Sequence, residues 1–125
     1  MGDEAGLGGT SPSAKRASKA AFFLKHGELL IGTLTYENGL WKFYYSEDFK
    51  KRPDLRPIIQ FPNKDRIYES DELWPFFGMR IPSLKQPSVS KIVADEHIEV
   101  ADHVRLLKRF GRRTVSNPYE LADCE

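Results

Sequence analysis

Several signals that usually identify an enzyme, a secreted protein or a membrane protein are missing from this chain of 125 residues. There is one cysteine, Cys124, so the chain has no internal disulfide that would indicate an oxidising compartment. The three histidines show no metal-ligand spacing. The longest apolar run near the start, Ala20–Leu24, is too short for a signal core or a membrane span. We therefore expect a cytoplasmic protein with no metal, no other cofactor and no contact with a membrane.

Catalytic motifs are missing as well. The glycines at positions 2, 6, 8 and 9 do not follow a strand, so they do not form a nucleotide-binding loop. The chain has no kinase catalytic loop, no metal-binding DFG triplet and no GxSxG elbow. The adjacent acids Asp71 and Glu72 are interpreted as charges at a helix N-terminus rather than as a catalytic pair. The sequence predicts that the protein is not an enzyme.

Charge of one sign is not in excess, because 19 lysines and arginines face 18 acids. This balance gives no general attraction to nucleic acid. One local exception is a cluster of cations without an acid among them: Arg105, Lys108, Arg109, Arg112 and Arg113. Two interpretations stay open, namely cations that suit the C-terminal dipole of a helix, and a basic surface for an acidic partner or DNA. The balanced charge and the absence of a helix-turn-helix pattern argue against direct DNA binding.

Composition divides the chain into three parts. Residues 1–19 are rich in Gly, Ser and Ala and are predicted to form a flexible arm. Residues 20–116 carry nearly all of the large apolar side chains and are predicted to form one domain. Residues 117–125 are predicted to be a polar tail.

The first half of the domain has the pattern of a sheet. Two turn signals, His26-Gly27-Glu28 and Asn38-Gly39, separate apolar runs. The predicted strands are Phe22–Leu24, Leu29–Tyr36, Leu40–Tyr45 and Ile58–Phe61, with a further pairing at Ile67–Tyr68. Alternation in the third strand places Trp41, Phe43 and Tyr45 on one face, which we expect to meet the core. Ser46 is expected to cap one short helical turn.

The second half has helical spacing. We expect a short helix capped by Ser70 or Asp71, a helix over Val89–Glu96, a helix over Val100–Phe110 that ends at Gly111, and a last strand at Thr114–Val115. The fold class is therefore α+β, with a small antiparallel sheet capped by helices from the C-terminal half.

The segment around Trp74 combines residue types that are common at protein interfaces. Trp, Met and Arg are typical interface anchors, and Trp74, Met79 and Arg80 lie within seven positions. For Trp74, a place in the core and a place at an interface stay equally open. With the basic cluster as a second surface, the candidate partner-binding residues are Trp74, Phe77, Met79, Arg80, Arg105, Arg109 and Arg112.

The order of these motifs resembles a known family. Gly32-Thr33-Leu34 precedes the aromatic strand Trp41–Tyr45, and a proline-flanked segment, Arg56–Pro62, follows. Leu73-Trp74-Pro75-Phe76-Phe77 and Leu106–Arg112 complete the pattern. Residues 21–116 resemble the N-terminal subdomain of HipA-family serine/threonine kinases, the toxins of bacterial toxin–antitoxin modules. Met79-Arg80-Ile81 departs from the family pattern, which usually runs through two leucines into the proline.

The resemblance implies a fold, a class of partner and a function. The sheet is expected to curl into a short barrel. In the family this subdomain packs against the kinase body and takes part in assembly with the DNA-binding antitoxin HipB, and in three-component modules the separate protein HipS restrains the kinase HipT. We therefore expect a HipS-like, non-catalytic regulator that binds and restrains a HipA/HipT-type kinase, with a HipB-like protein as a further partner. The alternative is a DNA-associated accessory protein that acts through the basic helix end.

Overall fold

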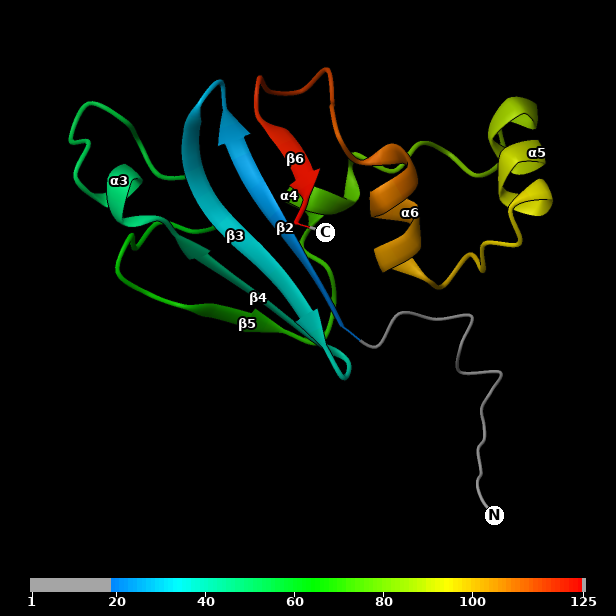
Figure 1. Ribbon diagram of the computed structural model, residues 1–125, viewed down its shortest axis with the longest axis horizontal. Helices are drawn as coiled ribbons and strands as arrows, with labels where there is room; N and C mark the ends of the chain where they lie inside the picture. Colours follow the sequence, from blue (N-terminus) through cyan, green and yellow to red (C-terminus); the bar gives the residue numbers. More distant parts are fainter. Residues whose placement is uncertain (1–18, 125) are drawn as a thin grey trace, which may run out of the picture.

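The computed structural model describes residues 19–124 and contains a five-stranded antiparallel sheet with the strand order β5-β4-β3-β2-β6 (Figure 1). The strands are β2 (Lys19–His26), β3 (Leu29–Glu37), β4 (Leu40–Tyr45), β5 (Tyr68–Ser70) and β6 (Glu120–Asp123). The helices are α3 (Glu47–Lys50), α4 (Pro75–Gly78), α5 (Pro87–Asp95) and α6 (His103–Phe110). The α+β class is confirmed. Residues 1–18 of the predicted arm lie outside the described residues, and Lys19 begins β2.

The expected barrel is wrong, because the sheet is open. β5 pairs with β4, and β6 pairs with β2, at opposite edges of the sheet. These edge strands have three and four residues, and they do not pair with each other, so the sheet does not close.

The two central hairpins form where the turn signals predict them. β2 and β3 are joined at Gly27, and β3 and β4 at Asn38-Gly39. Gly27, Asn38 and Gly39 have φ angles of 62°, 51° and 85°, which is the left-handed backbone that tight hairpins require. The second hairpin places Tyr36 directly opposite Trp41. The register of β3 and β4 is continuous from this turn, whereas the register of β2 and β3 shifts between Leu24 and Lys25.

One face of the sheet forms the core. Trp41, Phe43 and Tyr45 are all buried, as the alternation predicts, whereas Tyr44 between them is exposed. The Phe43 ring lies 4.6 Å from the ring of Phe61, so β4 packs directly on the long connection that follows α3. The core therefore depends as much on this connection as on the strands.

Helix α6 lies between the sheet and α5 (Figure 1). Val104 and Leu107 of α6 join the main core, and Leu106 packs in a second apolar cluster with Val89 and Val93 of α5. The helix begins at His103 instead of Val100, because the Asp102 carboxylate accepts a hydrogen bond from the Arg105 amide and caps it. Val100 is exposed and lies before the helix, so the predicted start of this helix is wrong.

Three further local predictions are wrong. Residues 58–61 form a turn instead of a strand, with the Phe61 amide donating to the Ile58 carbonyl. Ser70 ends β5, and α4 begins at Pro75, where proline is favourable because its missing N–H has no partner in the first turn. The last strand is β6, not Thr114–Val115, so the sheet extends past residue 116 into the segment expected to be a tail.

The hydroxyl group of Tyr45 explains why residues 58–61 turn. It donates to the Phe61 carbonyl at 2.7 Å and accepts from the Ile58 amide at 2.8 Å. Both backbone groups are thereby satisfied away from water without a neighbouring strand. Burial raises the pKa of the Tyr45 hydroxyl far above its ordinary value of 10.0.

Replacing Tyr45 by Phe should lower the free energy of unfolding by about 1–3 kcal/mol, because two buried backbone groups lose their partner. Urea denaturation measures the change, and Tyr44→Phe is the matched control on the exposed face, with an expected change below about 0.5 kcal/mol. The unfolded chain ionises this tyrosine near pH 10.0, whereas the folded protein does not, so native stability should fall above that pH. Equal effects of the two substitutions would contradict the assignment.

Candidate functional site

An open apolar groove of about 550 Å³ lies among three segments that are far apart in the sequence. Residues 56–60 form one wall, α4 with Met79 forms the second, and residues 116–119 form the third. Ile59 is 94% exposed and Met79 is 53% exposed. Exposed apolar side chains that gather in one concave surface are typical of contact sites for other molecules.

The first two walls are held together by polar contacts on their inner side. The Tyr45 hydroxyl fixes residues 58–61 from below, and Ile58 is buried while Ile59 points outward. The Gln60 side-chain carbonyl accepts from the Phe76 amide at 3.2 Å and so joins this turn to the first turn of α4. The apolar surface is thus built on a backbone that its own hydrogen bonds hold in place.

The third wall is attached through the buried guanidinium group of Arg80. One terminal nitrogen donates to the carbonyls of Gly111 at 3.2 Å and Arg112 at 3.3 Å. The other donates to the Asn117 side-chain oxygen at 3.2 Å and to the Tyr119 carbonyl at 2.9 Å. Burial lowers the pKa of Arg80 to about 10, so the group stays charged at neutral pH and is balanced by these oxygens.

Of the residues predicted at this surface, Met79 lines the groove. Arg80 lies beneath it and is 3% exposed, so in this structure it supports the surface from inside instead of presenting a charge to a partner. Phe77 is fully buried in the core and offers no surface to a partner, which corrects its placement among the contact residues. Trp74 is half-buried, with its ring 5.1 Å from that of Phe61, and lies outside the groove lining.

The basic residues near the end of α6 are largely paired with acids. Arg109 binds Glu96 at 2.9 Å, and Arg112 binds Glu120 at 3.0 Å. Arg105 donates to the carbonyls of Glu96 and His97. Arg112 and Arg113 together hold the pKa of Glu120 below its usual range. These pairs reduce the local positive potential that binding to DNA phosphates would need.

Ile59, Phe76 and Tyr119 are groove residues that the sequence prediction missed. The exposure of Ile59 was not predictable from neighbouring residues, because it follows from the 58–61 turn that the Tyr45 hydroxyl holds in place. No local pattern indicated Tyr119, because the contacts of Arg80 that fix its segment span 31 to 39 residues.

Within residues 19–124, no group of three or more His, Cys, Asp or Glu could hold a metal ion. In the same range, no helix is long and apolar enough to cross a membrane.

The open sheet, the short helices and the groove define a small α+β domain with an exposed apolar surface. Residues 24–116 match the family model of the HipA N-terminal domain. Since this match covers most of the chain, the protein belongs to the HipA N-terminal domain family. A solved structure of the N-terminal domain of HipA toxin shares the fold, with a TM-score of 0.59 and 18% identity over 85% of this chain and 93% of that one. No curated protein matches the chain.

Replacing Arg80 by Lys should lower the free energy of unfolding by about 2–4 kcal/mol, because one ammonium group cannot serve the oxygens that the two guanidinium nitrogens bind. Urea denaturation measures the loss, and hydrogen exchange should show the Leu121 amide of β6 less protected. Arg56→Lys is the control, since Arg56 is exposed on the groove and makes no hydrogen bond or ion pair with a described residue. An unchanged denaturation midpoint for Arg80→Lys would show that the buried network contributes nothing to stability.

Proposed function

We propose that this protein is a non-catalytic, antitoxin-like regulator that binds and restrains a HipA/HipT-type serine/threonine kinase. The proposal is supported by membership of the HipA N-terminal domain family across residues 24–116, together with the resemblance to a HipS-like protein. The single structural observation that carries it is the exposed apolar groove. A HipB-like DNA-binding protein is a further partner in the same proposal.

The shape of the groove favours a protein segment as its occupant. Its walls present Ile59 and Met79 outward, while the polar atoms of the supporting turn are used on the inner side. Covering these apolar side chains removes them from water, and such side chains at the centre of an interface commonly supply much of the binding energy. The kinase is therefore expected to insert an apolar side chain here.

The charge of the groove indicates which side chain the kinase would present next to the inserted apolar one. Arg56 is the only charged residue of the lining, and it makes no hydrogen bond or ion pair with a described residue. An acidic side chain next to the inserted apolar one would pair with Arg56 without displacing an existing partner. The basic cluster is a weaker contact candidate, because Arg109 and Arg112 already pair with acids.

The test is co-purification with a HipA/HipT-type kinase encoded by a neighbouring gene. Ile59→Ser and Met79→Ser together should weaken the complex at least about tenfold, because each substitution removes a large apolar contact from the interface. Titration calorimetry measures the affinity, and an autophosphorylation assay measures whether the kinase is restrained.

Ile67→Ser is the matched control, since Ile67 is 60% exposed but lies outside the groove. It should leave affinity unchanged. If both Ile67→Ser and the groove variant bind as the unaltered protein does, the kinase contacts another surface. If no kinase co-purifies, or if the bound kinase keeps full activity, the proposed restraint is wrong.

A further inference from the structure

The side chain of Met79 places a thioether group in the lining of the apolar groove, and solvent reaches it. Met79 is 53% exposed and is the only methionine among the residues that the structure describes. It belongs to neither of the two apolar clusters of the core, whereas its neighbours Phe77 and Ile81 pack there. The thioether is therefore part of the groove surface and not of the packed interior.

The backbone around Met79 is held in place on both sides. Its amide donates to the Pro75 carbonyl at 3.0 Å, and the Arg80 amide donates to the Phe77 carbonyl at 3.1 Å. The Arg80 side chain is buried and binds oxygens of residues 111–119. A chemical change at the Met79 sulfur therefore alters the groove surface and leaves the frame of the groove intact.

Peroxides oxidise an exposed thioether to a sulfoxide. The sulfur lone pair attacks one oxygen of hydrogen peroxide, and an S–O bond forms as the O–O bond breaks. The second oxygen leaves as hydroxide and takes up the proton of the first, so methionine and hydrogen peroxide give methionine sulfoxide and water. Methionine sulfoxide reductases reverse the change, because two thiols are oxidised to a disulfide while the sulfoxide oxygen leaves as water.

The sulfoxide changes the kind of surface that the groove presents. The thioether is apolar, whereas the sulfoxide oxygen is a polar hydrogen-bond acceptor. A partner that covers the groove removes this oxygen from water, and an acceptor that is left without a donor weakens the complex. Arg56 is the only charged donor of the lining, and the acidic side chain expected from the partner needs the same group. The sulfoxide and the partner therefore compete for one donor.

We propose that Met79 is a site of reversible oxidation, and that its sulfoxide lowers the affinity of the groove for its partner. A bound partner covers the thioether, so the free protein is the form that reacts. Oxidation of the free regulator then leaves more of the kinase unrestrained. The oxidation site rests on the geometry of the groove alone, whereas the effect on the kinase rests on the proposed function.

The first measurement needs no kinase. The full chain is treated with hydrogen peroxide, catalase removes the peroxide, and peptide mass spectrometry follows the sulfoxide at Met79. N-acetylmethionine amide in the same solution gives the rate of an unshielded thioether. Met79 should react within about fivefold of that rate, because about half of its side chain is exposed. A slower reaction shows that the groove shields the sulfur and overturns the proposal.

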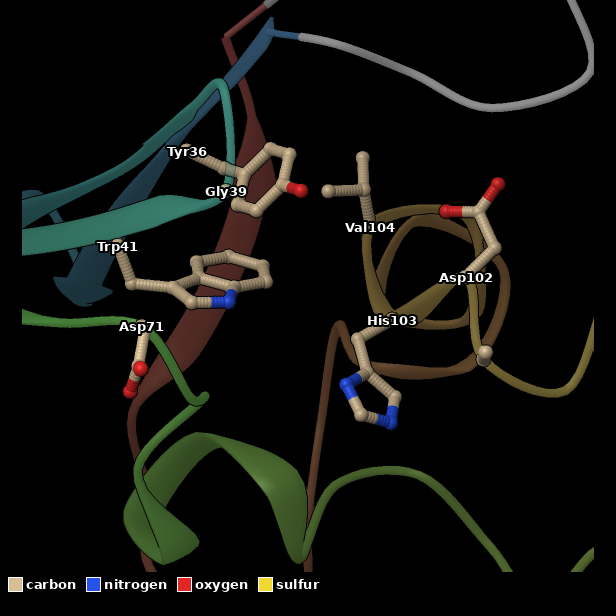
Figure 2. A pocket seen from close by; sticks show the side chains of 8 residues that line it. Tyr36, Gly39, Trp41, Asp71, Asp102, His103 and Val104 are labelled. Atoms are coloured by element: carbon tan, nitrogen blue, oxygen red, sulfur yellow. The ribbon is translucent and has the colours of Figure 1, made fainter. Parts of the chain in front are cut away.

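The second measurement shows whether oxidation stays confined to the groove. A separate pocket of about 150 Å³ lies between the β3–β4 hairpin and α6, with Trp41 on one side and His103 on the other (Figure 2). It shares no lining residue with the groove. The indole N–H signal of Trp41 in the NMR spectrum of the ¹⁵N-labelled chain should therefore stay in place after oxidation, and Trp74→Phe assigns it. The urea denaturation midpoint should stay unchanged as well. A shift of either shows that oxidation disturbs the core and overturns the proposal.

The third measurement uses the kinase that co-purifies with the protein. A half-oxidised sample is offered to a limiting amount of kinase, and the bound and free chains are compared by mass spectrometry. The ratio of thioether to sulfoxide at Met79 should be at least about fivefold higher in the bound chains. Cys124 is the internal control, because peroxide oxidises thiols as well and Cys124 lies outside the groove. Its oxidised forms should divide equally between bound and free chains.

Methionine sulfoxide reductases A and B should restore binding of the oxidised chain, and the affinity of Met79→Leu should be the same before and after peroxide. Equal capture of both forms of Met79 overturns the effect on the partner, as does a peroxide effect that Met79→Leu retains. If the unoxidised protein binds no kinase, the proposed function fails and the effect on the kinase fails with it. The first measurement still decides whether Met79 is an oxidation site.

Discussion

The guanidinium group of Arg80 holds together parts of the chain that lie 31 to 39 residues apart. It takes a charge out of water, and oxygens from the end of α6 and from residues 112–119 replace the lost solvent. The chain then continues directly into β6. The third wall of the groove and the edge of the sheet therefore depend on the same buried network.

Tyr45 supports the groove wall formed by residues 56–60, as Arg80 supports the wall formed by residues 116–119. Its hydroxyl satisfies the backbone of the 58–61 turn from inside the core, and this leaves Ile59 facing solvent. In both walls a buried polar side chain forms hydrogen bonds with backbone groups, while apolar side chains remain on the surface. An exposed apolar surface of this kind is maintained by hydrogen bonds beneath it and not by its own packing, so it remains available to a partner.

The sequence predicted those features whose cause lies within a few residues. The hairpins follow from Gly27 and Asn38-Gly39, and the core face of β4 follows from alternation. Features with a distant cause were not predictable: the 58–61 turn depends on Tyr45, and the burial of Arg80 depends on acceptors that no local pattern reveals. The residue types around Met79 indicated an interface segment, which stays a prediction, but they could not show which side chains point outward. The strand and helix patterns indicated the fold class, and the family resemblance indicated the kind of partner that we propose, whereas the groove itself came only from the structure.

Trp74 lies next to the groove in the sequence without lining it. It precedes Pro75 of the groove, and its ring packs edge-on against Phe61. Shortening Trp74 would therefore loosen the connection behind the groove as well as remove any contact of its own, so a loss of binding in that variant has two possible causes. Ile59 is almost fully exposed, and its truncation disturbs no neighbour in the core. A loss of affinity in an Ile59 variant is therefore evidence that the partner contacts the groove surface directly. Comparison with that variant then shows how much of the loss in a Trp74 variant comes from a lost contact and how much from a weakened support of the groove.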